Sequence, residues 1–275
     1  MLANSADSQT ISVAPRTAVL TKSDLGATFT DEVTFVVATG TEPAWVLDRS
    51  FAVDWLDNIA VDKDGNIFLG RKGRVDKFSP SGELLWSVDP WPGCYFQSNA
   101  SDIGVDSKGN VYVAFTYYGG TPPTGILHRG GRDVLLAKIS PDGIPGRPKR
   151  IATSADDYVY EMVIDDDDFI YLSGWTGGTL MDPVYLSIAW NTWVAKYDSD
   201  FQDDAPGYND NSDLEPVWGS QITHKAYYQP SMVDLSVSPT GDVYVAGEIY
   251  SDLNYEGPYY GSSDYYISRW TNSGQ

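Results

Sequence analysis

Oxygen-bearing side chains at the spacing of a calcium loop stand out first in this sequence. Asp62, Asp64 and Asn66 occupy alternate positions around Gly65, and carboxylate and amide oxygens spaced in this way begin a calcium-binding loop. The same residue types also favour a tight turn, because Asp and Asn bond to their own main chain and glycine tolerates positive φ. The choice between the two depends on whether the ligand set recurs elsewhere in the chain.

A denser acidic stretch, DSDFQDDAPGYNDNSDLEP, lies at residues 198–216. Calcium takes about six to eight hard oxygen ligands of this kind. The candidate ligands are Asp198, Asp200, Asp203, Asp204, Asp210 and Asp213, with Glu215 beside them. Because they follow no fixed ligand spacing, a solvated acidic loop is the alternative interpretation. Ca²⁺ is therefore the candidate metal, and no cofactor is required.

The first stretch belongs to a repeat with four copies. They are NIAVDKDGNIFLG from residue 58, DIGVDSKGNVYVA from residue 102, EMVIDDDDFIYLS from residue 161 and DLSVSPTGDVYVA from residue 234. Each copy has a short apolar strand, a polar turn and a second alternating strand, which is the pattern of a β-hairpin. The fourth copy replaces the ligand set by Ser238, Thr240 and Asp242, so the turn is maintained and the calcium ligands are not.

Glycine marks this turn in three copies, and we expect it to need positive φ there. The residues are Gly65, Gly109 and Gly241. In the third copy we place Asp167 at this position, since Asp tolerates a left-handed conformation at some cost. The run of carboxylates at residues 165–168 is thereby explained as a turn.

Further strands follow each hairpin. A third strand carries one basic residue at an equivalent position in each copy: Lys77, Lys138, Lys196 and Arg269. A fourth strand follows, ELLWSV at residues 83–88, EPVWGSQI at 215–222 and a weaker RPKRIA at 147–152. Near the N-terminus, residues 32–40 and 43–50 are predicted as the third and fourth strands of another copy.

Four antiparallel strands per unit, repeated along the chain, predict an all-β fold, a β-propeller of about five blades. The expected blades are residues 10–50, 57–89, 101–153, 158–222 and 233–275, after a polar segment 1–9. The last blade lacks its own fourth strand. Since an unpaired edge is a liability, an N-terminal segment, a downstream part of a longer protein or another chain is expected to complete it.

These units resemble the SBBP-type β-propeller repeats of exported bacterial and archaeal proteins, through IAVDKDGNIFLG, IGVDSKGNVYVA and LSVSPTGDVYVAGEIYSDLN with DYYISRW. The first unit is equally similar to an NHL repeat. The resemblance implies a propeller with extracellular or cell-surface scaffolding and binding roles, and transfers no catalytic residue. The streptogramin-lyase type of propeller depends on histidine and metal, whereas this chain has only His128 and His224.

Surplus aromatic residues fall in the long connections on one face of the predicted propeller. Variable loops on a rigid scaffold commonly bind partners, and aromatic faces suit sugars, peptides and protein surfaces. The candidate contact residues are Trp91, Tyr95, Tyr117, Tyr118, Trp175, Tyr185, Trp190, Tyr227, Tyr228, Tyr250, Tyr255, Tyr259 and Tyr260. The alternative is that these rings pack on one another and stiffen the loops.

Composition excludes several classes of function. A formal charge of −20 repels phosphate backbones and anionic membrane surfaces, so we expect no nucleic-acid partner. No apolar run approaches the roughly 20 residues of a membrane span, and no membrane insertion is expected. MLANSADSQT lacks the regions of a signal peptide, as a mature exported form also would. Cys94 is the only cysteine, and it lacks a nearby basic partner that would activate it.

The sequence therefore predicts a non-enzymatic binding or structural module of the cell surface or extracellular space. Its aromatic loop face would contact a protein or glycan partner, within a multi-chain assembly or with a strand supplied by another chain. The alternative is a carbohydrate-active hydrolase or lyase with carboxylates in the central channel. Two channel carboxylates, one with a raised pKa, would favour that enzyme.

Overall fold

The computed structural model is all-β in every part that it describes. It describes residues 30–33, 36–38, 43–46, 49–52, 56–71, 74–89, 102–118, 126, 128–181, 190–201, 213–223, 231–249 and 264–275. The chain divides into two compact units, one of Met1–Asp54 with Ser81–Glu83 and the other of Trp55–Pro80 with Leu84–Gln275. Across these described ranges, no helix has the length and apolar character needed to cross a membrane.

The first unit contains two short antiparallel ladders. β1 (Thr30–Val33) pairs with β4 (Arg49–Ala52), and β2 (Val36–Ala38) pairs with β3 (Pro43–Val46). The sequence predicted one strand on each side here. Within the described residues, each predicted strand is represented by two short strands. The earlier strands expected from residue 10, and the polar segment 1–9, lie outside the described residues.

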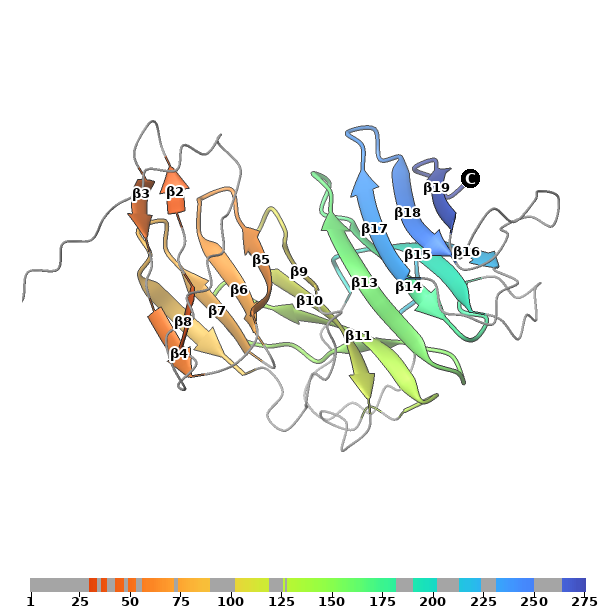
Figure 1. Ribbon diagram of the computed structural model, residues 1–275, viewed down its shortest axis with the longest axis horizontal. Helices are drawn as coiled ribbons and strands as arrows, with labels where there is room; N and C mark the ends of the chain where they lie inside the picture. The colour runs from red at the N-terminus through yellow and green to blue at the C-terminus, as the bar shows by residue number, and fades with distance from the viewer. Residues whose placement is uncertain are drawn as a thin grey trace, which may run out of the picture. The chain divides into compact units, whose positions relative to one another are not determined.

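The second unit consists of antiparallel sheets whose strands follow one another in chain order (Figure 1). The first sheet contains β5 (Leu56–Val61), β6 (Ile67–Arg71), β7 (Arg74–Phe78) and β8 (Leu84–Val88). The second contains β9 (Asp102–Val105), β10 (Val111–Tyr118), β11 (Arg132–Ile139) and β12 (Lys149–Ile151). The third contains β13 (Asp157–Ile164), β14 (Ile170–Thr176), β15 (Asn191–Tyr197) and β16 (Trp218–Thr223). The last contains β17 (Ser231–Val237), β18 (Val243–Ile249) and β19 (Asp264–Trp270).

This arrangement confirms the predicted fold class. Three of these sheets have four strands, and the last has three within the described residues. The predicted weak fourth strand of the second sheet exists as β12, which pairs with β11. Each sheet is therefore an up-and-down meander of the propeller-blade type.

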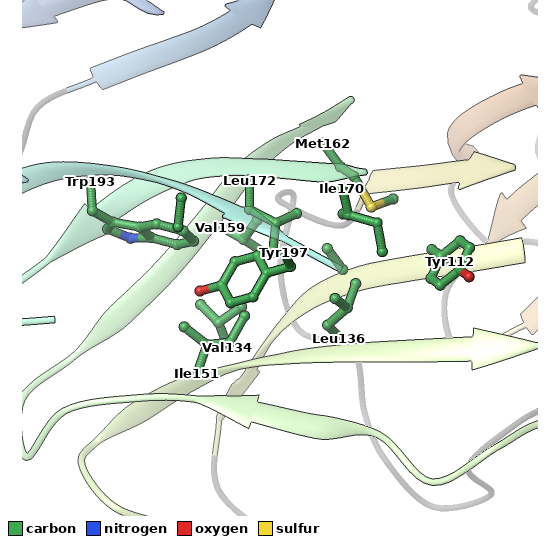
Figure 2. Close-up of a cluster of buried hydrophobic side chains, with 12 residues drawn as sticks. Tyr112, Val134, Leu136, Ile151, Val159, Met162, Ile170, Leu172, Trp193 and Tyr197 are labelled. Atoms are coloured by element: carbon green, nitrogen blue, oxygen red, sulfur yellow. The ribbon is translucent and has the colours of Figure 1, made fainter. Parts of the chain in front are cut away.

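The core lies between successive sheets, because alternate residues of each strand face the neighbouring sheet. Figure 2 shows the cluster between the second and third sheets, where Trp193 and Tyr197 of β15 pack near Val134 and Leu136 of β11. Equivalent clusters separate the first sheet from the second and the third from the last. The inner strands β5, β9, β13 and β17 contact one another in turn.

The hairpin turns are held by their own side chains, as the repeat predicted. Asp62 Oδ1 accepts hydrogen bonds from the main-chain N–H groups of Asp64 (3.0 Å) and Asn66 (2.8 Å). Asp106 and Asp165 accept the equivalent pairs in the next two sheets. Gly65 adopts φ +80°, as expected. Asp62 therefore holds the hairpin turn that the repeat predicted.

The third turn corrects the predicted left-handed position by one residue. Asp168, rather than Asp167, holds the left-handed position, with φ +66°. Its carboxylate accepts hydrogen bonds from the main-chain N–H and the hydroxyl of Ser107 in the preceding sheet, both at 2.7 Å. The strained conformation is thus accompanied by a contact between two sheets that glycine could not make.

The basic residue of the third strand reaches the next sheet in the first three sheets of the second unit. Lys77 Nζ donates to the carbonyl oxygen of Pro141 (3.3 Å), and Lys138 Nζ donates to that of Ser199 (3.1 Å). Lys196 Nζ donates to Asn272 Oδ1 (2.6 Å). All three acceptors lie in the turn that follows the third strand of the next sheet. The repeated lysine therefore joins consecutive sheets.

Candidate functional site

Two of the predicted contact aromatics lie inside the protein. Tyr117 belongs to β10 and Trp175 to β14, and both side chains are buried. The sequence assigned them to loops, but β10 continues to Tyr118 and β14 to Thr176. Strand alternation therefore turns both rings inward, where they pack and cannot touch a partner directly.

Trp190 is the third predicted aromatic whose side chain is described, and it is half-buried. It meets Trp175 edge to face, with ring centroids 4.4 Å apart. Trp175 also stacks on Tyr158 (3.8 Å) and donates its indole N–H to the hydroxyl of Tyr160 (2.8 Å). The side chains of the remaining predicted set lie outside the described residues: Trp91, Tyr95, Tyr118, Tyr185, Tyr227, Tyr228, Tyr250, Tyr255, Tyr259 and Tyr260.

The described part of the acidic stretch does not gather its carboxylates. Asp198 accepts a hydrogen bond from the main chain of Asp200 (2.8 Å), and Asp200 pairs at 3.4 Å with Lys108 on the surface. Among the described residues no group of three or more His, Cys, Asp or Glu side chains could hold a metal ion. Asp203, Asp204 and Asp210 lie outside the described residues.

A cavity of about 660 Å³ lies beside β12 of the second sheet and the end of β15 of the third. We call it the rim pocket. Three segments enclose most of it: the link between β12 and β13, the residues after β14, and the segment before β16. Its lining residues are Arg129, Ile151, Ala152, Thr153, Ser154, Ala155, Gly177, Gly178, Thr179, Leu180, Met181, Tyr197, Asp213, Leu214, Glu215 and Pro216. Polar and apolar residues thus both line a volume that suits a small molecule.

Tyr197 supplies the group in this pocket that most needs a ligand. Its side chain is completely buried, and within the described part of the chain its hydroxyl has no hydrogen-bond partner. Burial raises the pKa of Tyr197, so the hydroxyl keeps its proton at neutral pH. Buried polar groups are almost always hydrogen-bonded. Because this hydroxyl is closed to solvent, a bound acceptor would reach it only after the lining residues move.

Asp213 joins the rim pocket to the second sheet. Arg129 Nη1 pairs with Asp213 Oδ2, and Arg150 Nε donates to Asp213 Oδ1 at 2.6 Å. The main-chain N–H of Leu214 donates to the carbonyl oxygen of Arg150 (2.7 Å). The sequence grouped Asp213 with the calcium candidates, but two guanidinium groups neutralise it here. This segment instead runs along the outer edge of β12 and closes one side of the pocket.

A fully buried acid, Asp157, lies behind the pocket wall. Asp157 accepts hydrogen bonds from the main-chain N–H of Thr153 (2.6 Å) and from the hydroxyls of Thr153 and Thr176. Burial raises the pKa of Asp157 to about 7. With its oxygens committed to these donors, Asp157 fixes the link from β12 to β13 rather than facing the pocket.

Three carboxylates occupy one repeat position on the inner strands: Asp102 of β9, Glu161 of β13 and Asp234 of β17. Asp102 accepts hydrogen bonds from the main-chain N–H groups of Ile103 (2.8 Å) and Met162 (2.6 Å), and burial raises its pKa to about 6. Burial, followed by the charges of Asp102 and Asp234, raises the pKa of Glu161 to about 7. Asp102 thereby bonds two sheets together, while Glu161 is an acid held partly protonated near neutral pH.

Little in the sequence indicates the rim pocket. Its walls come from segments that are far apart along the chain. Glycine allows two of these segments to pack closely. A Cβ on Gly177 would lie 2.8 Å from the ring of Trp190 and 3.3 Å from Ala155. The adjacent GG pair at residues 177–178 was the available signal. The inner-strand carboxylates could have been found by aligning the four copies, where Asn58 occupies the same position.

No family model matches this chain, and no curated protein matches it. Among solved structures, it is similar to a protein of unknown function from Bacteroides caccae, with 12% identity, 90% of this chain and 89% of that chain covered, and a TM-score of 0.35. It is also similar to a GH43_12 protein retrieved from a capybara gut metagenome, with 10% identity, 77% and 38% covered, and a TM-score of 0.38. A third is virginiamycin B lyase from Staphylococcus aureus, with 10% identity, 78% and 84% covered, and a TM-score of 0.26. These structures include enzymes and a protein of unknown function, and at such low scores they assign no activity to this chain.

Proposed function

We propose that this protein is a non-enzymatic binding module, and that the rim pocket holds a neutral saccharide-type ligand. The observation that carries the proposal is the buried, unpartnered hydroxyl of Tyr197 at a cavity of about 660 Å³. A ligand hydroxyl or ring oxygen would accept its hydrogen bond. Because an unmade hydrogen bond of a buried group costs about 1–3 kcal/mol, a ligand that satisfies it gains affinity there.

The other lining groups support the same ligand class. Thr179 and Ser154 bring hydroxyls to the pocket, while Leu180, Met181 and Pro216 bring apolar surface. Sugars present both hydroxyl groups and apolar C–H faces, so they match such a lining. Anionic ligands are disfavoured, because the guanidinium of Arg129 is already paired with Asp213 and the protein carries a charge of −20.

The proposal extends to location and partners as the sequence suggested them. The resemblance to SBBP-type repeats supports an exported, surface-associated protein. The aromatic residues of the connections outside the described ranges would then contact a glycan or a protein, and the pocket would hold one unit of that partner.

Replacing Tyr197 by Phe separates ligand binding from folding. Without ligand, we expect unchanged or slightly higher stability, since a buried donor without a partner is removed. With ligand, we expect an affinity loss of about tenfold, which is about 1.4 kcal/mol. Titration calorimetry against a panel of neutral oligosaccharides measures the affinity, and thermal unfolding measures the stability.

Tyr171→Phe is the matched control. Tyr171 is equally buried, but its hydroxyl donates to Asp165 Oδ2 at 2.9 Å and it does not line the pocket. This variant should lose stability and keep the affinity. If no oligosaccharide binds, or if Tyr197→Phe binds as tightly as the natural protein, the proposed function is wrong.

The raised pKa of Glu161 favours one second candidate, the carbohydrate-active enzyme. In that mechanism Glu161 would act as the general acid, with Asp234 as the opposing carboxylate. Glu161→Gln should then abolish release of reducing or unsaturated ends from a polysaccharide. If neither the natural protein nor the variant releases such products, this candidate is excluded and the binding module stands.

A further inference from the structure

The hydroxyl of Tyr197 lies beside the rim pocket but is closed to solvent. A ligand therefore reaches it only when part of the pocket wall moves. Two described segments of that wall pack on the hydrophobic cluster that contains Tyr197 (Figure 2). One is residues 177–181, which we call the strap, and the other is residues 213–216, which we call the edge segment. Their side chains on the cluster are Leu180, Met181 and Leu214.

The edge segment is held by charged groups and by the main chain. Asp213 at its start pairs with the guanidinium groups of Arg129 and Arg150. Directly after its end, the main-chain N–H of Val217 donates to the carbonyl oxygen of Lys196 (2.7 Å). Because hydrogen bonds between ionised groups are stronger than those between neutral groups, this part of the wall resists opening.

A single neutral side chain makes three hydrogen bonds to the strap. Gln221 of β16 accepts at Oε1 from the main-chain N–H groups of Leu180 (3.0 Å) and Met181 (3.3 Å). Its Nε2 donates to the carbonyl oxygen of Gly178 (3.1 Å). The strap reads GGTLM and contains no charged side chain, so it cannot form an ion pair. Its attachment is therefore the more easily broken of the two.

The strap also has a fixed start and a prepared resting place. The main-chain N–H of Gly177 donates to the carbonyl oxygen of Asp156 (2.8 Å), which fixes its first residue. Gly219 and Gln221 are two residues apart in β16, so both positions face the same side of the sheet. A Cβ on Gly219 would lie 2.4 Å from the sulfur of Met181. The glycine thus leaves the space that Met181 fills.

We propose that the strap is a gate to the buried end of the rim pocket, with Gln221 as its latch and the Gly177–Gly178 pair as its hinge. When the three hydrogen bonds of Gln221 break together, the strap leaves β16 and Tyr197 becomes accessible, while the edge segment stays in place. Glycine at the hinge absorbs the rotation of the main chain at little cost. Water replaces the broken neutral hydrogen bonds, so this opening is a local event that does not need global unfolding.

This control of access rests on the proposed binding function, but the movement itself needs no ligand. Amide hydrogen exchange of the natural protein therefore tests which segment opens. The N–H groups of Leu180 and Met181 should exchange at least about tenfold faster than those of Leu214 and Val217. Each of these four groups is hydrogen-bonded in the closed protein, so the comparison is direct. Equal or faster exchange at Leu214 and Val217 would overturn the proposal.

Gln221→Leu tests the latch, because it keeps a side chain of similar size without the amide. Nitration by tetranitromethane, located by peptide mass spectrometry, measures access to Tyr197. We expect Tyr197 to react at least about tenfold faster in this variant than in the natural protein. Tyr112 is equally buried in the same cluster but does not line the pocket, so it should stay protected. Ser220→Ala, on the opposite face of β16, is the control variant and should leave Tyr197 protected.

Two results of the nitration would overturn the gate. One is a Tyr197 that stays protected in Gln221→Leu, and the other is an equal gain at Tyr112, which would indicate general loosening. Should Gln221→Leu not fold, Gln221→Glu keeps an acceptor for both N–H groups and loses only the bond to Gly178, so it should show a smaller gain at Tyr197 alone. Oligosaccharide binding without this gain would leave the proposed function standing and remove the gate.

Discussion

Replacing Gly174 with alanine is expected to destabilise the protein by about 3 kcal/mol or more, a large effect for one added methyl group. Gly174 lies in β14, between Val159 of β13 and Trp193 of β15. A Cβ there would overlap the main-chain oxygen of Tyr158 and come to 2.8 Å from its carbonyl carbon. Main-chain atoms inside a sheet cannot move aside as the end of a side chain can.

The surrounding contacts prevent relaxation at Gly174. The indole N–H of Trp193 crosses this position and donates to the same Tyr158 oxygen, at 3.1 Å. The register of β13 against β14 also shifts between Val159 and Glu161, which brings that carbonyl close. Alanine would therefore break a buried hydrogen bond as well as strain two strands.

Gly70→Ala is the matched control. A Cβ on Gly70 would meet the main-chain oxygen of Asn58 at 3.6 Å, an ordinary contact. The equivalent positions of two other sheets already hold Ala114 and Ala246. We expect a change within about 0.5 kcal/mol, or a small gain from the stiffer unfolded chain. Chemical denaturation of both variants measures the difference, and similar losses would contradict the explanation.

The sequence predicted those parts of the fold that local chemistry determines. A turn that needs positive φ and an Asp that bonds to its own main chain depend on only a few neighbouring residues. Gly65 and Asp62 could therefore be assigned to the turn by residue type and spacing. The third turn was misplaced by one residue: the aligned copies place Asp168, and not Asp167, opposite Gly65, and φ +66° at Asp168 confirms that alignment.

The candidate site could not be predicted in the same way, because it depends on long-range contacts. Asp213 was grouped with neighbouring acids, yet its partners Arg129 and Arg150 come from the preceding sheet. Tyr197 occurs in a strand where alternation predicts only burial, and the missing partner of its hydroxyl is a property of the assembled core. Sequence position likewise could not show that β14 extends far enough to bury Trp175.

The stability of this protein should fall as the pH rises from about 5 to about 8, because three buried acids have raised pKa values. Asp102, Asp157 and Glu161 all have pKa values raised by burial, to about 6, 7 and 7. In each case the folded protein holds the proton more tightly than the unfolded chain. The stabilisation that these three protonated groups supply is therefore complete below their pKa values in the unfolded chain, about 4. It is lost as the pH rises through about 6 to 7. We expect a higher melting temperature at about pH 5 than at about pH 8.

Neutral isosteres should remove this dependence one group at a time. Asp157→Asn keeps an oxygen for the main-chain N–H of Thr153, so it should match the natural protein at about pH 5 and exceed it at about pH 8. Glu161→Gln should act in the same direction by about 1 kcal/mol, a value reduced for its partial exposure to solvent. Thermal unfolding followed by circular dichroism across this range measures both.

Loss of one negative charge could by itself stabilise a protein with a charge of −20. Glu83→Gln, at an exposed position, controls for that effect and should shift the melting temperature little, with the pH slope unchanged. If Asp157→Asn and Glu161→Gln behave like this control, the raised pKa values do not govern stability. If only Asp157→Asn flattens the pH slope, the pKa of Glu161 is that of an acid in contact with solvent. Glu161 would then lack the raised pKa on which its role as a general acid rests.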